Sequence, residues 1–168
     1  MANDSKQTPT VRLGPLSHIG AVVKDCEKAA AWWERVLGVG PFTIGVWELD
    51  EKTQFRYRGK PGRAKVKAAI SQGDGVFIEL VQIPLEGETP HAEFFRQHGE
   101  GFQHIAFHVQ NINQVVADLA KEGLTPTLQY KFEMTRPDGR RQSIEEAYLD
   151  SVEHVGGSIQ LLEIKQLD

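Results

Sequence analysis

The alternation of apolar and polar residues divides the chain into two similar halves. Two apolar runs of strand length begin with a histidine, the first over residues 18–25 and the second, 86 positions later, over residues 104–111. They end at Asp25 and Asn111, residue types that often cap the N-terminus of a helix. The apolar positions that follow each of them have helical spacing, so each half begins with a strand and a helix.

Both halves continue with further strands after the helix. Gly38 and Gly123 stand where a helix would end in the left-handed conformation, and a proline follows each within three residues. Strand-like runs then occupy about 42–49 and 66–71 in the first half, and about 127–135 and 144–149 in the second. Each half closes on a glycine-led apolar run, at 75–80 and 156–161. The predicted order is β-α-β-β-β, twice, with the two modules sharing one sheet surface.

These boundaries predict one domain after a short tail. Residues 1–12 are polar and are expected to form a flexible N-terminal tail. Residues 13–168 then form a single domain, with module one at about 13–83, a linker at about 84–101 that contains a short helical piece, and module two at about 102–168.

Composition narrows the functional class. The chain has 168 residues, 40% hydrophobic and 25% charged, as is typical of soluble globular proteins. Its single cysteine, Cys26, allows no internal disulfide and no cysteine-based metal site, which favours a reducing compartment and a cytoplasmic location. We find no signal-peptide pattern and no apolar run of the about 18 residues that span a bilayer. The net charge of −4 predicts no nucleic-acid or membrane partner, although residues 52–67 carry seven Lys and Arg and no acid.

Four residues with metal-ligand chemistry occupy equivalent places in the two modules. His18 and His104 begin the first strand of each module, and Glu79 and Gln160 interrupt the last. The spacing is similar, 61 residues from His18 to Glu79 and 56 from His104 to Gln160. Two imidazoles, a carboxylate and an amide oxygen suit a divalent first-row ion, so we predict one Co, Ni, Mn, Zn or Fe ion per chain. Such an ion is a Lewis acid that can stabilise an enolate.

Each of these residues has a simpler interpretation when it is taken alone. A histidine in a strand is more often at the surface or hydrogen-bonded in the core, and Glu79 and Gln160 could point outward. The recurrence of the pattern in both modules favours metal binding. Glu163 would replace Gln160 only if the strand register slipped, because Glu163 points to the opposite face. Of the other histidines, His108 shares the strand face of His104, and we expect three to be solvated: His91, His98 and His154.

Three phrases carry a resemblance to a known family. They are Leu16–Val23, Phe77–Gln82 and above all Glu100–Val109, which looks like a Glu-Gly-x-x-His-Ile-Ala-Phe family segment. Over residues 16–164 the sequence resembles the vicinal oxygen chelate (glyoxalase/bleomycin resistance/dioxygenase) superfamily, and within it the methylmalonyl-CoA epimerase-like branch. The resemblance implies an α+β fold in which two βαβββ modules form a cupped mixed β-sheet with helices on the outside.

The resemblance also implies a site and a reaction. It assigns the metal ligands to His18, Glu79, His104 and Gln160, where the family usually has Glu at the fourth position, a residue that often transfers a proton there. An amide cannot accept that proton at neutral pH. The implied activity is that of a metal-dependent isomerase or epimerase, which stabilises the enolate of an acyl-CoA or other small carbonyl substrate.

A base and a substrate-binding surface are then required. The candidate bases are Glu48 and Glu145, ahead of the ligand Glu79. The basic segment suggests Arg56 and Arg58 for the CoA phosphates, although a solvated strand face explains these cations equally well. Aromatic residues that could stack on a substrate include Trp47 and Tyr57.

Three other functions fit the same sequence. A glyoxalase I-type lactoylglutathione lyase needs the same enolate stabilisation. An Fe(II) dioxygenase needs two histidines and a carboxylate, and Gln160 at the final ligand position argues against it. A non-catalytic small-molecule-binding protein of the same fold would use an apolar cup, and the co-occurrence of His18, Glu79 and His104 argues against that. A homodimer is expected, as in many members of the family that the chain resembles.

Overall fold

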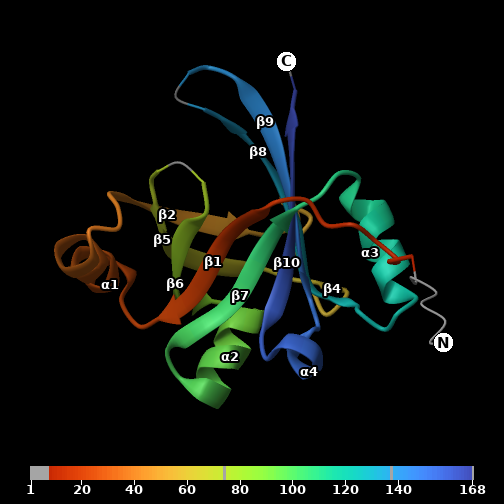
Figure 1. Cartoon of the computed structure of the whole chain (residues 1–168), viewed down its shortest axis with the longest axis horizontal. Helices are drawn as coiled ribbons and strands as arrows, with labels where there is room; N and C mark the ends of the chain where they lie inside the picture. The colour runs from red at the N-terminus through yellow and green to blue at the C-terminus, as the bar shows by residue number, and fades with distance from the viewer. Residues whose placement is uncertain (1–7, 74, 137, 168) are drawn as a thin grey trace, which may run out of the picture.

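The first module follows the predicted order, with one small hairpin inserted. The computed structural model describes residues 8–73, 75–136 and 138–167. Module one contains β1 (Leu16–Val23), α1 (Cys26–Trp32), the π-helical turn η1 (Trp33–Leu37), β2 (Phe42–Leu49), β3 (Arg56–Tyr57), β4 (Lys60–Pro61), β5 (Ala64–Ser71) and β6 (Phe77–Glu86) (Figure 1). The β3–β4 hairpin lies in the basic segment 52–67, for which the sequence predicts no element.

The second module repeats this order after a connecting helix, α2 (Pro90–His98). Its elements are β7 (Gly101–His108), α3 (Ile112–Ala120), β8 (Pro126–Thr135), β9 (Arg141–Leu149), α4 (Val152–Val155) and β10 (Ser158–Gln166). The helix expected in the linker is α2, which begins with a Thr89 cap and Pro90 in its first turn, a favourable start for a helix. Alternating apolar positions place the predicted strands within three residues of those observed, except that β6 and β10 continue beyond the predicted ends at residues 80 and 161.

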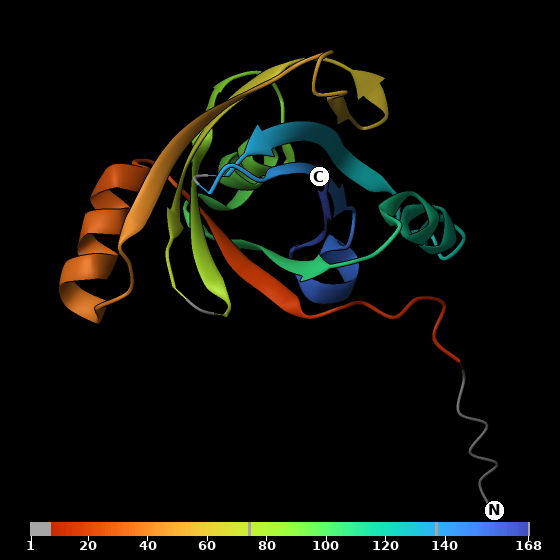
Figure 2. The same cartoon turned by 90° about the horizontal axis from the view of Figure 1, so that it is seen from above.

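One mixed sheet joins the modules. The strand order among the described residues is β2-β5-β6-β1-β7-β10-β9-β8-β3-β4. The first strands of the modules, β1 and β7, pair antiparallel at the centre, while β6 runs parallel to β1 and β10 parallel to β7. Figure 2 shows the sheet curling around a central space, with α1 and α3 outside it. The prediction of an α+β fold with a cupped mixed sheet is confirmed.

The inserted hairpin links the two outer edges of this sheet. After β2 the chain crosses to the other module, where β3 pairs with β8, Arg56 opposite Gln129. The Lys131 N–H donates to the Thr53 carbonyl over 2.7 Å. Leu49, Phe55 and Leu128 form part of the buried cluster beneath this crossing. Because both edges are tied together, the cup has walls from both modules of the same chain.

Helices α1 and α3 cover the outside of the sheet, each through an apolar cluster (Figure 2). The expectation that helices lie on the outside does not hold for α2, because its residue His91 lines the central cavity. Asp25 caps α1 as expected, with its carboxylate accepting from the Lys28 N–H over 3.1 Å. Asn111 does not cap α3 with its side chain, contrary to the sequence pattern. Instead, the Glu163 carboxylate of β10 accepts from the N–H of Asn111 and of Ile112, over 2.6 and 3.3 Å. Glu163 therefore faces α3 on the outer side of the sheet, as the sequence analysis assumed.

The N-terminal segment is described in part. Residues 1–7 of the expected tail, 1–12, lie outside the described residues. In the rest of that segment, the Thr10 hydroxyl donates to Glu122 over 2.8 Å, and Val11 packs against the cluster beneath α3. No helix among the described residues is long and apolar enough to cross a membrane.

Candidate metal centre

The four predicted ligands lie on the four central strands of the sheet. His18 is on β1 and His104 on β7, and their side chains meet because β1 and β7 pair directly. Glu79 on β6 lies beside Gly20 of β1, and Gln160 on β10 lies beside Ala106 of β7. All four therefore project from the concave face, two from each module.

Three of these side chains bring one donor atom each to a common point. His104 Nε2 lies 3.2 Å from Glu79 Oε2 and 3.3 Å from His18 Nε2, and His18 Nε2 lies 3.6 Å from Glu79 Oε2. Metal–ligand bonds of about 2.1 Å at tetrahedral or octahedral angles separate neighbouring donors by roughly 3.0–3.4 Å. The observed separations are close to this range, so the three atoms can share one ion.

Hydrogen bonds turn the His104 ring so that Nε2 faces the site. Its Nδ1 lies 2.7 Å from Gln103 Oε1, and the Gln103 amide nitrogen donates to Ser158 Oγ over 3.0 Å. Because an amide oxygen only accepts, Nδ1 carries the proton and Nε2 offers a lone pair. His18 has a similar arrangement, with Nδ1 3.2 Å from Ser17 Oγ.

Burial keeps both rings neutral, as metal ligation requires. Desolvation lowers the pKa of His18 to about 4 and that of His104 to about 3, against an ordinary value of 6.5. At neutral pH neither ring therefore carries a positive charge to pair with Glu79. Without a cation, the lone pair of His104 Nε2 faces the carboxylate oxygen of Glu79, two acceptors at hydrogen-bond distance.

Unpaired acceptors in the same place fit a cation. Among the described residues, Glu79 Oε2 and Gln160 Oε1 are buried oxygens without a hydrogen-bond partner. The Gln160 amide nitrogen is occupied, since it donates to Glu146 over 2.6 Å, which leaves the amide oxygen free to bind a cation. Gln160 also interacts with the His18 ring. Since a buried oxygen without a partner is costly, a divalent ion would satisfy Glu79 Oε2 and Gln160 Oε1, and the two imidazoles could complete its ligand set.

A glycine makes room for one ligand ring. Gly20 lies directly opposite His104 in the β1–β7 ladder, and an added Cβ would lie 1.8 Å from His104 Cε1 and 2.1 Å from Nε2. The imidazole therefore rests on the bare backbone of Gly20. Glycine in a strand often marks such a close approach.

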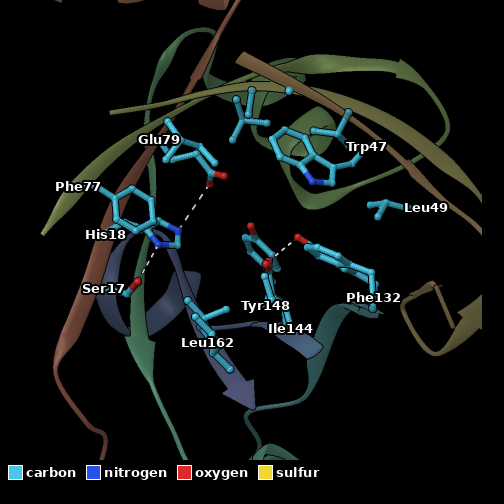
Figure 3. A pocket seen from close by; sticks show the side chains of 18 of the residues that line it. Ser17, His18, Trp47, Leu49, Phe77, Glu79, Phe132, Ile144, Tyr148 and Leu162 are labelled. Atoms are coloured by element: carbon cyan, nitrogen blue, oxygen red, sulfur yellow. Dashed lines mark hydrogen bonds and ion pairs between the residues drawn. The ribbon is translucent and has the colours of Figure 1, made fainter. Parts of the chain in front are cut away.

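The ligands stand at the wall of a large cavity. It has a volume of about 700 Å³ and is lined from both modules by alternate residues of the surrounding strands. Figure 3 shows His18 and Glu79 on one side and Trp47 and Phe132 across from them. The Phe77 ring stacks on the His18 ring, with centroids 4.5 Å apart. A molecule in this cavity would reach the metal-binding group from within the apolar cup.

The structure does not bring the two predicted bases to this cavity. Glu48 points outward from β2 and pairs with Lys65 over 3.1 Å, with 76% of its side chain exposed. Glu145 faces the other side of β9, where it lies 3.6 Å from Lys131. Successive strand residues face opposite sides of a sheet, so the next residue, Glu146, faces the cavity. The sequence analysis named Glu145 and not Glu146, because each face of β9 carries a glutamate among apolar residues and the sequence does not show which face lines the cavity.

Glu146 is a partly buried carboxyl group in contact with the predicted ligand Gln160. Its Oε2 accepts from the Tyr130 hydroxyl and from the Gln160 amide. Burial raises the pKa of Glu146 to about 8, although both hydrogen bonds favour the ionised form. A carboxyl group with this pKa can both accept and donate a proton near neutral pH.

Of the four predicted substrate-binding residues, one lines the cavity. Trp47 on β2 projects into it. Tyr57 packs against the neighbouring core cluster instead. Arg56 donates to the carbonyl of Gly59, and Arg58 pairs with Glu93 over 2.9 Å. Four of the seven cations in the basic segment pair with acids from outside it, and the sequence alone does not reveal these pairs.

The expectation that His91 is solvated is wrong. His91 is on α2, is 3% exposed and lines the cavity. Its ring lies 5.6 Å from that of His104 and 5.0 Å from that of Tyr148, and neither ring nitrogen has a hydrogen-bond partner among the described residues. The sequence held one signal for the burial of His91. Thr89 and Pro90 are typical of a helix start, so they place His91 in the first turn of a helix, and that helix packs on the sheet.

Comparisons with known proteins agree with this architecture. A family model described as the glyoxalase/bleomycin resistance protein/dioxygenase superfamily matches residues 17–142. The mitochondrial methylmalonyl-CoA epimerase of Bos taurus is 30% identical over 115 residues, 68% of this chain and 57% of that protein. The chain spans a little over half the length of the curated relatives that it matches.

Solved structures share the fold at low sequence identity. The methylmalonyl-CoA epimerase of Mycobacterium tuberculosis superposes with a TM-score of 0.55 at 18% identity, over 94% of this chain and 93% of that one. A methylmalonyl-CoA epimerase in complex with methylmalonyl-CoA and NH4+ superposes with a TM-score of 0.57 at 17% identity, over 90% of this chain and 95% of that one.

Proposed function

This chain belongs to the glyoxalase/bleomycin resistance protein/dioxygenase superfamily, and on that premise we propose that it is a metal-dependent isomerase of the epimerase type. It would remove a proton next to a substrate carbonyl and return one there. The observation that carries this proposal is the convergence of His18, His104 and Glu79 on one point, beside the unpaired oxygen of Gln160. The names of the relatives support an acyl-CoA or another carbonyl compound as substrate.

His18, His104, Glu79 and Gln160 are the residues that would hold a divalent ion. When bound, the ion would supply positive charge beside the substrate carbonyl and so stabilise an enolate. The two imidazoles, the carboxylate and the amide oxygen favour Co, Ni, Mn, Zn or Fe. Gln103 holds the His104 ring in the tautomer that binds, and Gly20 gives the ring its place.

Glu146 is the carboxyl group to which we assign proton transfer. It lines the cavity next to the ligand Gln160 and receives hydrogen bonds from Tyr130 and Gln160. These donors stabilise the carboxylate when the proton leaves, while burial favours the acid when the proton returns. Glu146 therefore takes the role that the sequence analysis sought in Glu48 and Glu145.

A second candidate function is that of an Fe(II) dioxygenase. The specific observation in its favour is that His18, His104 and Glu79 form a set of two histidines and one carboxylate. Oxygen consumption by the Fe(II)-loaded protein with carbonyl substrates tests this candidate. Isotope exchange without oxygen consumption supports the isomerase instead.

Metal content is the first experiment. Protein purified without a histidine tag is analysed by elemental mass spectrometry beside the variants His104→Ala and His154→Ala. His154 is an exposed histidine on α4 and serves as the matched control. We expect about one divalent ion per chain in the native protein and in His154→Ala, and little in His104→Ala. Retention of the ion by His104→Ala would contradict the ligand assignment.

Proton transfer is measured by exchange with heavy water. Methylmalonyl-CoA and other carbonyl compounds are incubated with the protein in D2O, and deuterium at the α-carbon is followed by mass spectrometry. Glu146→Gln should slow exchange by about 100-fold or more, the usual range for loss of a general acid–base group. Its neighbour Glu145→Gln, on the other face of β9, should exchange at the native rate. Equal rates in the two variants would refute the role of Glu146, provided that both retain the metal.

A further inference from the structure

Most of the side chains that line the cavity are apolar. Alternate residues of β2, β5, β6, β8, β9 and β10 supply its walls, among them Trp47, Ile70, Phe132, Ile144, Leu162 and Ile164. Because these strands come from both modules, the apolar surface encloses a bound molecule from several sides (Figure 3). Such a lining favours a ligand that buries apolar surface.

Positive charge is absent from the described lining residues. The ionisable side chains there are two tyrosines, the histidines His18, His91 and His108, and the acids Glu79 and Glu146, with no Lys or Arg. A carboxylate or phosphate placed away from the metal-binding group would be buried without a counter-charge. Such burial is strongly unfavourable, and the two acids would add repulsion.

Three cations of the basic segment 52–67 are already paired with acids that do not line the cavity. Arg63 pairs with Glu86 over 2.9 Å, and Lys67 pairs with Glu27 over 2.5 Å. Arg58 lies 2.9 Å from Glu93 and also 3.7 Å from Asp150. The phosphates of a CoA group would therefore compete with carboxylates that these cations already contact.

The volume of the cavity and the aromatic side chains in its wall restrict the kind of molecule that fits. At about 30 Å³ per small group, a volume of 700 Å³ has room for roughly 20 nonhydrogen atoms. Trp47 and Phe132 stand on one side of this space and Phe77 on the other (Figure 3). Aromatic side chains pack well against flat rings, with stacked or edge-to-face geometry.

We propose that the substrate is a carbonyl compound whose body, beyond the oxygens that reach the metal-binding group, is uncharged, apolar and ring-containing. This inference rests on the proposed function, because the metal-binding group holds the carbonyl end. It narrows the substrate class from acyl-CoA and small carbonyl compounds in general to compounds whose apolar body is enclosed by the cup. A free carbonyl compound satisfies this description better than a CoA thioester.

A series of hydroxamic acids tests this class. Each presents the same two oxygens to a bound metal while its body changes from methyl to phenyl to naphthyl, or to a carboxyethyl group in succinic monohydroxamate. Binding to the Ni²⁺-loaded protein is measured by calorimetry. We expect 2-naphthohydroxamate to bind at least about 100-fold more tightly than acetohydroxamate, from the apolar area that the ring buries. Succinic monohydroxamate should bind no more tightly than acetohydroxamate.

Two phenylalanine variants locate the effect. Phe132→Ala removes a ring from the cavity wall, whereas Phe102→Ala removes a ring that is 63% exposed and does not line the cavity. Phe132→Ala should lower the affinity for 2-naphthohydroxamate by at least about 10-fold and that for acetohydroxamate by less than about twofold. Phe102→Ala should leave both affinities unchanged.

The outcomes separate this inference from the proposed function. Equal or tighter binding of succinic monohydroxamate, or a naphthyl preference below about threefold, would overturn the inference while metal binding still supports the function. Absence of metal uptake and of acetohydroxamate binding would refute the function. The apolar preference is then read from 2-acetylnaphthalene, a ketone that needs no metal, and its failure to bind would overturn the inference as well.

Discussion

Replacing Gly20 by alanine tests whether the backbone of β1 holds a metal ligand in place. The added Cβ would lie 1.8 Å from Cε1, 2.1 Å from Nε2 and 2.4 Å from Nδ1 of His104. Carbon atoms in contact are about 3.5–4.0 Å apart, so the ring must move by roughly 2 Å. The backbones cannot separate easily, because Gly20 and His104 are partners in the central β1–β7 ladder.

A ring shift of this size removes His104 from the metal site. Metal–ligand distances tolerate changes of about 0.2 Å, a tenth of the expected movement. Loss of a residue that only orients a ligand typically lowers metal affinity by about 10- to 100-fold, so displacement of the ligand itself should cost at least about 100-fold. The crowding should also lower the free energy of unfolding by about 1–3 kcal/mol.

The assay compares Gly20→Ala with Gly101→Ala. Gly101 lies on β7 opposite Val22, and a Cβ there would meet only the Phe94 ring, at 3.8 Å. Both substitutions restrict the backbone of the unfolded chain equally. The difference in the free energy of unfolding between the two variants therefore reports an effect on the folded state. Metal affinity is measured by competition with a chelating dye, and stability by urea unfolding. If Gly20→Ala binds metal as tightly as Gly101→Ala, the reasoning about the close approach is refuted.

Three further predictions concern stability. In the metal-free protein, burial holds the pKa of His18 at about 4 and that of His91 and His104 at about 3. Below pH 6.5 the unfolded chain therefore binds more protons than the folded chain, and the free energy of unfolding falls by about 2 kcal/mol for each unit by which the pH is lowered. Burial also raises the pKa of Glu146 to about 8, so above pH 6.5 the free energy of unfolding falls as the pH rises. Urea unfolding between about pH 4.5 and 8.5 should therefore show maximal stability near pH 6.5. A flat profile would contradict the burial of these groups. Glu163→Ala removes the acceptor of the Asn111 N–H and of the buried Ile112 N–H at the start of α3, and should lower the free energy of unfolding by about 1–3 kcal/mol in urea unfolding. Glu133→Ala, at the exposed end of β8, should change it little. His91→Leu removes a buried ring with two unpaired nitrogens and should stabilise the protein by about 1 kcal/mol by the same measurement, so a loss of stability would reveal a partner for His91.

The sequence by itself determined the modular architecture and predicted the four residues of the candidate metal site. Strand and helix periodicities are local properties, and they recur in both modules at His18 and His104 and again at Glu79 and Gln160. The repeat therefore placed all four side chains at equivalent points of one sheet. The structure brings the donor atoms of three of them together and leaves the oxygen of the fourth, Gln160, unpaired beside Glu146.

Only the tertiary structure decided which neighbouring groups join that site. The choice between Glu145 and Glu146 depends on which face of β9 lines the cavity. Each face carries a glutamate among apolar residues, because one face lines the cup and the other packs beneath α3. Long-range pairing likewise set the partner of Arg58 and the burial of His91. These outcomes depend on contacts between residues distant in the chain, which local periodicity cannot encode. The predicted ligands lie on a repeated pattern of strands, which local periodicity does encode.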